Sequence, residues 1–147
     1  MKLLRKYIFH PLTALKKIKN HFLTKPHRNK LFISLYKTVK PFKEPNKWIF
    51  IVGCYNSGTT LLENILSTHP DISVLDEGVF KTDQLITPEE LGWTRMWHKV
   101  FNKVRLTERD STININELKR DWGLFFNNNK SVYLEKSIVN STRMRWF

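Results

Sequence analysis

A strand, a glycine-bounded loop and a helix follow one another between Trp48 and Pro70, and this order constrains the fold more than any other feature. Residues 48–52 form an apolar run typical of a central parallel strand that is covered on both faces. Residues 53–60 form the loop. The helix expected next has an apolar inner face made of Leu61, Leu62, Ile65 and Leu66. Because proline cannot continue a helix interior, this helix is expected to end near His69-Pro70. The order predicts a P-loop-like α/β fold, a three-layer α/β/α arrangement around a parallel sheet.

The loop itself has the spacing of a phosphate cradle. Gly53 and Gly58 are separated by four residues, as in a P-loop, and the first N–H groups of the following helix are free to face an anion. Thr59 stands where a Walker loop carries its lysine, so hydrolysis of a nucleoside triphosphate is poorly supported. The hydroxyls of Ser57, Thr59 and Thr60 favour hydrogen bonding to a terminal anionic group. A tight turn without a ligand is the alternative interpretation.

Residues 51–62, followed by His69-Pro70, resemble the phosphosulfate-binding loop of sulfotransferases that use PAPS (3′-phosphoadenosine 5′-phosphosulfate). The resemblance implies PAPS as co-substrate, a P-loop-like fold without hydrolysis of a nucleoside triphosphate, and no metal. It assigns PAPS binding to five consecutive residues: Asn56, Ser57, Gly58, Thr59 and Thr60. The family usually has Lys or Arg at the position of Asn56. Loss of such a transition-state donor costs of order ten- to a thousandfold in rate.

A candidate base follows this loop. Residues 71–75 predict a short strand that leads into Asp76-Glu77-Gly78. Sulfuryl transfer to a hydroxyl needs a base for the acceptor proton. The resemblance to tyrosylprotein, Golgi and bacterial sulfotransferases puts this role on Glu77, with Asp76 as the alternative. Judged from the residues alone, Asp-Glu-Gly is good turn chemistry. His69 is expected to cap the end of the helix rather than to act as the base.

A second parallel strand is predicted over residues 132–135, and it leads into Lys136-Ser137. Residues 134–137, Leu-Glu-Lys-Ser, resemble a family segment written Glu-Lys-(Ser/Thr)-Pro, with Ile138 in place of the proline. Because the carboxyl ends of strands face the ligand crevice in open α/β sheets, Lys136 is expected near PAPS. There it would offset charge and substitute for the cation missing at position 56. A solvated surface lysine is the alternative.

The rest of the neutral part of the chain predicts further helices. Thr87-Pro88-Glu89-Glu90 has the order of a helix start, and the helix continues through residues 91–101. Its Trp93 and Trp97 are expected in the core, with lining of the acceptor site as the alternative. A short helix is predicted over 116–122, a turn over 127–130 and a helix over 138–147.

Charge divides the chain into two parts. The net charge is +12, and residues 1–47 hold 13 basic residues and one acidic residue, whereas residues 48–147 hold 12 of each. Residues 1–47 are therefore a basic N-terminal segment, with a helix over residues 12–22 and a linker over 40–47. It either packs on the domain, or docks on an anionic membrane surface or acidic partner, or binds nucleic acid. No motif supports sequence-specific recognition of nucleic acid.

The sequence therefore predicts a basic segment (1–47) and the N-terminal part of a sulfotransferase-like domain (48–147), apparently truncated and of little activity alone. The expected reaction transfers a sulfuryl group from PAPS to a hydroxyl or amine of a small-molecule or glycan acceptor, most readily a carbohydrate. The alternatives are a nucleotide-binding, kinase-like P-loop protein and a non-catalytic protein that docks through its basic segment. No apolar run approaches the ~20 residues that cross a bilayer, and the cytoplasm, with peripheral membrane contact, is the expected location.

Overall fold

The computed structural model describes residues 30–93 and 96–147, and its centre is a parallel sheet of three strands. These are β1 (Lys47–Ile51), β2 (Ile72–Asp76) and β3 (Val132–Lys136). Their order across the sheet is β1-β3-β2, so the last strand in the chain lies between the first two. Ile51 and Asp76 both lie opposite Lys136. The carboxyl ends of all three strands therefore meet at one edge of the sheet.

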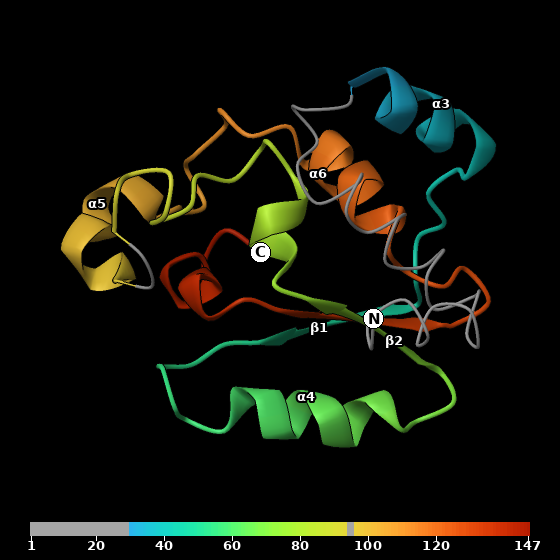
Figure 1. The fold of residues 1–147 in the computed structure, drawn as a ribbon, viewed down its shortest axis with the longest axis horizontal. Coiled ribbons are helices and arrows are strands. Elements are labelled where there is room, and N and C mark those ends of the chain that lie inside the picture. The colour runs from blue at the N-terminus through green and yellow to red at the C-terminus, as the bar shows by residue number, and fades with distance from the viewer. Residues whose placement is uncertain (1–29, 94–95) are drawn as a thin grey trace, which may run out of the picture.

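Helices cover both faces of this sheet (Figure 1). α4 (Thr59–Ser67) lies on one face, and η2 (Gly78–Lys81), α6 (Ile115–Gly123) and η4 (Ile138–Thr142) lie on the other. α3 (Lys30–Val39) lies beside α6, while η3 (Trp97–Val100) and α5 (Phe101–Val104) lie beside η4. The prediction of an α/β fold with helices on both faces of a parallel sheet is confirmed.

The expectation that residues 48–52 form a central strand is wrong for the described sheet. β1 is an edge strand of that sheet, and the most deeply buried strand is β3, in which Tyr133, Leu134 and Glu135 are inaccessible to solvent. An apolar run reports that both faces of a strand are covered, but it does not report whether both of its edges are paired.

Aromatic side chains fill the layer between the sheet and α6. The rings of Phe126 and Tyr133 stack at 4.2 Å between centroids, and Trp48 meets Tyr133 edge-on at 5.6 Å. Trp122 of α6 packs against Trp48 and is almost fully buried. Burial of each such side chain contributes roughly 1.5–3 kcal/mol, so this layer fixes α6 over β1 and β3.

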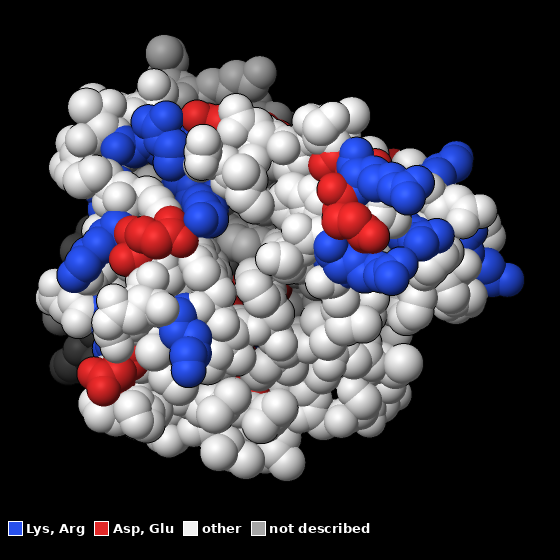
Figure 2. Space-filling view, turned by 180° about the vertical axis from the view of Figure 1, so that it is seen from behind, with Lys and Arg blue, Asp and Glu red and all other residues white. Residues whose placement is uncertain are grey.

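The predicted inner face of α4 is also wrong. Leu61, Leu62 and Ile65 are exposed and only Leu66 is half-buried, whereas Glu63 is buried against the sheet. Figure 2 shows few charged side chains over the lower part of the molecule, where α4 lies. Glu63 turns inward because its carboxylate forms an ion pair with the ammonium group of Lys136, 3.6 Å away. Apolar periodicity cannot reveal that a charged side chain turns inward toward a buried partner.

The helix predicted from Thr87 is wrong: its capping box is present, but residues 88–92 form only a turn. The Thr87 hydroxyl accepts from the Glu90 N–H, and the Glu90 carboxylate accepts from the Thr87 N–H, which is a capping box. After one turn Gly92 adopts φ +83°, and the Trp93 and Gly92 N–H groups donate to Pro88 and Glu89, as in a Schellman motif. The continuous helix is therefore wrong, and the glycine ends it.

The helix predicted over residues 116–122 is confirmed as α6, whose N-cap is Asn114. The turn over 127–130 is confirmed as well. Residues 138–147 form the 3₁₀-helix η4 followed by turns, so the longer helix expected there is wrong. Each hydroxyl of Ser141 and Thr142 donates to the carbonyl three residues earlier, which matches the tighter 3₁₀ winding.

The described part of the basic segment packs on the domain. In α3, Ile33 is buried against Leu124, and the Lys37 ammonium group lies 2.5 Å from the Asp121 carboxylate. In the linker, Phe42 packs on Gly123 of α6. For residues 30–47 the packing interpretation is therefore confirmed, whereas the helix predicted over residues 12–22 lies outside the described residues. Among the helices described, none combines the length and apolar character needed to span a bilayer.

Candidate functional site

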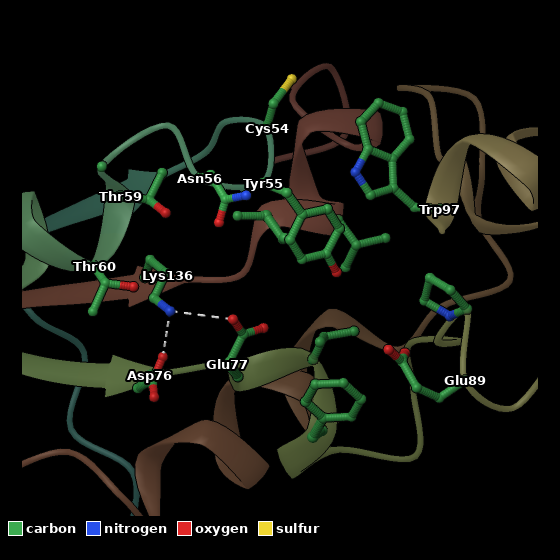
Figure 3. A pocket seen from close by; sticks show the side chains of 16 residues that line it. Cys54, Tyr55, Asn56, Thr59, Thr60, Asp76, Glu77, Glu89, Trp97 and Lys136 are labelled. Carbon is green, nitrogen blue, oxygen red and sulfur yellow. Dashed lines mark hydrogen bonds and ion pairs between the residues drawn. The ribbon is translucent and has the colours of Figure 1, made fainter. Parts of the chain in front are cut away.

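A cavity of about 680 Å³ opens at the carboxyl ends of the strands (Figure 3). It is lined by the loop after β1, the turn after β2, the end of β3 and residues near η3. Most of the predicted site residues line it together: Asn56, Gly58, Thr59, Thr60, Glu77 and Lys136. Ser57 is not among the lining residues, because its hydroxyl donates to the Cys54 carbonyl at 2.6 Å within the loop. Ser57 therefore holds the loop in shape.

The loop after β1 is closely packed against itself and against η4. A Cβ atom on Gly53 would lie 2.8 Å from Ser57 Oγ and 2.9 Å from Thr59 Cγ2. The Gly53 N–H donates to Ser141 Oγ at 3.0 Å, and that hydroxyl also contacts the Gly53 carbonyl. Glycine is required at position 53 because the loop turns back over this residue.

The loop ends at an uncapped helix start. Gly58 is the N-cap of α4 with φ +83°, and its position carries no side-chain cap. The first N–H groups of a helix have no intrahelical partner, and the N-terminal end of the helix dipole is positive. The hydroxyls of Thr59 and Thr60 lie beside these N–H groups (Figure 3). This end of the cavity is chemically suited to a compact anionic group.

Asn56 occupies the tip of the same loop. Its φ is +58°, in the left-handed region that asparagine tolerates better than other non-glycine residues. Its side chain lines the cavity, where its amide can donate a hydrogen bond but supplies no charge.

Lys136 enters the cavity from the end of β3 and is surrounded by carboxylates. Its Nζ atom lies 2.6 Å from Asp76 Oδ1, 3.1 Å from Glu77 Oε1 and 3.6 Å from Glu63 Oε2. Burial lowers the pKa of Lys136, but the hydrogen bonds and charges of Asp76 and Glu77 outweigh it and hold that pKa above the ordinary range. The interpretation of Lys136 as a solvated surface lysine is wrong, since its side chain is only 6% exposed.

The carboxylates of this cluster differ in their surroundings. Burial, followed by the charge of Asp76, raises the pKa of Glu63 above its usual value. The side chain of Asp76 is 62% exposed, whereas that of Glu77 is 32% exposed and extends into the cavity. Of the two candidate bases, Glu77 therefore has the more sheltered position.

The turn that carries Glu77 is conformationally strained. Glu77 has φ +50° and ψ +54°, a left-handed conformation that costs a residue with a Cβ atom roughly 1–2 kcal/mol. Such strain persists only where surrounding contacts enforce it, and it is concentrated at functional sites.

Aromatic and apolar side chains also line the cavity: Tyr55, Phe80, Pro88, Trp97 and Val139. Trp97 lies on the side of the cavity away from Thr59 and Thr60 (Figure 3). Trp97 lies at the cavity and also packs on the hydrophobic core, whereas Trp93 is 43% exposed and is not among the lining residues, so its expected place in the core is wrong. His69 lies at the other end of α4, where its ring nitrogen accepts from the Asp71 N–H, as expected for a residue that fixes this chain reversal.

Two acidic residues of the site escaped the sequence analysis. Glu63 lies in a helix whose apolar spacing predicts a different inner face, and Glu135 lies within the Leu-Glu-Lys-Ser segment. Glu135 is fully buried, and Gly78, Ser137 and Asn140 all donate to its carboxylate. An acidic residue within a strand of otherwise buried residues was the available signal. Among the described residues, no group of His, Cys, Asp and Glu is arranged to hold a metal ion.

The fold and the cavity define the class of α/β proteins that bind ligands at the carboxyl ends of parallel strands. A family model described as "Sulfotransferase family" matches residues 48–147, and the chain belongs to this family. Searches of curated proteins and of solved structures found no match.

Proposed function

We propose that this protein transfers a sulfuryl group from PAPS to a hydroxyl or amine of a carbohydrate acceptor. The observation that carries the proposal is that an uncapped helix start and a carboxylate–lysine pair line the same cavity. One end is suited to the anionic donor, and the other leaves room for an acceptor next to Glu77. The family assignment supports sulfuryl transfer in general.

The donor's 5′-phosphosulfate suits the loop after β1. The N–H groups of Asn56, Gly58, Thr59 and Thr60 and the hydroxyls of the two threonines would hold it, because each hydrogen bond to a charged group contributes about 1.5–3 kcal/mol. Ser57 would act indirectly, through its bond to the Cys54 carbonyl. Thr59 in place of a P-loop lysine favours this donor over ATP.

Glu77 would serve as the general base. In the transfer, a bond forms between sulfur and the acceptor oxygen while the bond from sulfur to the 5′-phosphate oxygen breaks. The acceptor proton passes to the Glu77 carboxylate, and PAP (3′-phosphoadenosine 5′-phosphate) leaves with the electron pair. General base catalysis of this kind contributes about 10²–10⁴-fold.

Lys136 would hold Glu77 and offset developing charge. An ammonium group has three N–H donors, and three carboxylates surround this one within 3.6 Å. Contact with the leaving phosphate therefore requires Lys136 to exchange one partner, and Glu63 is the most distant of the three. We expect Lys136 to orient Glu77 in the resting protein and to turn toward the donor when it binds.

The acceptor would lie against Tyr55, Phe80 and Trp97. Sugar rings have apolar faces that pack on aromatic side chains, and hydroxyls on the other edge would reach Glu77. The basic N-terminal segment remains a candidate for contact with an anionic membrane surface, a role that liposome co-sedimentation of the whole chain measures.

The deciding experiment is a thermal-stability titration of the purified chain with PAP and, separately, with ATP. A ligand that binds only the folded state raises stability by RT ln(1 + [L]/Kd). We expect a shift with PAP that Thr59→Ala abolishes and that the matched variant Thr68→Ala keeps, because Thr68 lies at the far end of α4. A shift with ATP but not PAP would favour the kinase-like alternative. No shift with PAP would overturn the proposed donor.

A further inference from the structure

The turn after β2 is held by an unusually regular set of hydrogen bonds. Three consecutive N–H groups, those of Glu77, Gly78 and Val79, donate to three consecutive residues at the end of β3. Their acceptors are the carbonyl of Lys136 at 2.7 Å, the carboxylate of Glu135 at 3.0 Å and the hydroxyl of Ser137 at 3.1 Å. The end of β3 therefore holds the backbone on which Glu77 is carried.

Glu135 is the centre of this arrangement. Its Oε1 atom accepts from the Gly78 N–H and from the Ser137 hydroxyl, and its Oε2 atom accepts from the Asn140 amide at 2.8 Å. Asn140 in turn accepts from the Arg143 guanidinium at 3.0 Å. Every one of these side chains is at least nine-tenths buried.

The turn has no room to move toward Glu135. A Cβ atom on Gly78 would lie 2.8 Å from Glu135 Oε1, so only glycine allows this approach. The Gly78 carbonyl is held as well, since it accepts from Trp122 Nε1 at 2.8 Å. These contacts enforce the left-handed conformation of the neighbouring Glu77.

Side chains on the two faces of β3 contact the Glu77 segment in different ways. Successive side chains of a strand point to opposite faces, so Lys136 faces α4 while Glu135 faces the layer of η2 and η4. Lys136 contacts the carboxylate of Glu77, whereas Glu135 contacts the backbone that follows it. Adjacent residues of one strand thus fix the same glutamate at two points.

We propose that Glu135 and Ser137 are positioning residues that set where the Glu77 carboxylate lies in the cavity. This inference rests on the proposed role of Glu77 as the base. Burial of a carboxylate is costly unless its oxygens are hydrogen-bonded, and an apolar residue would fill this space at lower cost. An apolar residue could not accept from Gly78, Ser137 and Asn140 at the same time.

The test compares Glu135→Gln and Ser137→Ala with the unsubstituted chain and with Thr142→Val. Thr142 is a matched control because its buried hydroxyl on η4 donates to Val139 and contacts no residue of the turn. Three quantities are measured: hydrogen exchange of the Gly78 and Val79 amides, affinity for PAP, and PAP release from PAPS with water as the acceptor.

We expect Ser137→Ala to accelerate exchange of the Val79 amide about tenfold or more, because that amide loses its acceptor. We expect Glu135→Gln to accelerate exchange of the Gly78 amide by a similar factor, because a glutamine side chain offers one acceptor oxygen where the carboxylate accepts through two. PAP affinity should stay within about twofold, because the loop after β1 is untouched. PAP release should fall about tenfold or more in kcat with KM for PAPS unchanged, since small misplacements of a reacting group are costly. Thr142→Val should change none of these. If Glu135→Gln fails to fold, Ser137→Ala carries the test alone.

A Glu77→Gln variant separates the two proposals. If Glu77→Gln abolishes PAP release while both positioning variants keep normal exchange and normal kcat, the positioning role is overturned and the base remains. If Glu77→Gln retains full PAP release, Glu77 is not the base, and the positioning role falls with it. Loss of kcat in Thr142→Val equal to that in Ser137→Ala would also overturn the inference, because the effect would then be one of general stability.

Discussion

Lys136 and Asp76 lie opposite one another in the β2–β3 pairing, with 2.6 Å between Nζ and Oδ1. The two residues are 60 positions apart in the chain, and only the parallel register brings them together. Because Glu77 follows Asp76 directly, the same register places Glu77, the candidate base, next to Lys136. The contact of Lys136 with these two carboxylates is therefore a product of strand pairing.

Replacement of Lys136 by methionine should destabilise the fold. The variant leaves the buried Glu63 without its cation, and removal of one partner from a buried pair costs about 3–5 kcal/mol. Since Asp76 is largely exposed, we expect a loss near the lower end of that range at pH 7. Urea unfolding measures it.

Acidification should restore part of the stability that is lost in Lys136→Met. Burial and Asp76 already raise the pKa of Glu63, so the native state takes up protons before the unfolded state does, and stability rises as the pH falls. The matched control is Lys119→Met, which breaks an exposed pair with Glu44 and should cost less than about 1 kcal/mol. Equal losses in the two variants would contradict the prediction.

A methyl group at position 53 should abolish PAP binding. In Gly53→Ala the added Cβ atom collides with Ser57 and Thr59, so the loop must open and its N–H groups turn away. Gly92→Ala is the control, because its added methyl group meets open space and lies outside the loop after β1, although the φ of +83° at Gly92 strains any residue other than glycine. We expect Gly92→Ala to lose about 1 kcal/mol of stability and to keep PAP binding. Isothermal titration calorimetry with PAP distinguishes the two variants.

Restoring a cation at position 56 should strengthen donor binding. In Asn56→Lys an ammonium group joins the neutral donors of the loop after β1, and a charge-assisted bond to phosphate contributes about 1.5–3 kcal/mol, or roughly ten- to a hundredfold in affinity for PAP. Lysine tolerates the φ of +58° less well than asparagine, so stability should fall by about 1 kcal/mol. Unchanged PAP affinity would show that Asn56 does not face the donor.

The stability of the chain should depend on Glu135 between pH 4.5 and 7. Burial raises the pKa of Glu135 to about 7, although hydrogen bonds from Ser137, Asn140 and Gly78 oppose it, and Glu77 and Arg143 are the charged groups that act on it. Because the native state holds this proton more tightly than the unfolded state, stability falls as the pH rises through that window and levels off above it.

Urea unfolding of the unsubstituted chain and of Glu135→Gln at several pH values measures this dependence. The unfolding free energy of the unsubstituted chain should rise relative to that of Glu135→Gln as the pH falls from 8 to 5, because glutamine does not titrate. A difference that stays constant over the whole range would mean that Glu135 does not titrate in the folded protein.

Local patterns predicted the elements that carry the site. The apolar run of β1, the glycine spacing of the loop and the strand before Lys136 are properties of neighbouring residues, and each lies within about one residue of its expected place. The capping box at Thr87 was predicted in the same way. What ended that helix was a single glycine, Gly92, whose left-handed conformation outweighed the apolar spacing that follows it.

Contacts between distant segments could not be predicted in this way. The inward turn of Glu63 depends on Lys136, and Lys136 reaches Glu63 only because β3 inserts between β1 and β2. The role of Glu135 has the same origin, since its partner Gly78 lies 57 residues earlier. Such pairs are fixed by strand order and register, which one sequence does not reveal.

The strand order also has a consequence for folding during translation. β1 and β2 emerge from the ribosome first, yet each hydrogen-bonds only to β3 in the described sheet. Neither has a partner strand until residues 132–136 have been synthesised, about 85 residues after β1 begins. At 5–20 residues per second, β1 waits unpaired for several seconds. A nascent chain of this kind is a natural client for a holding chaperone, and synonymous changes that slow translation between β2 and β3 would lengthen the interval in which it can aggregate.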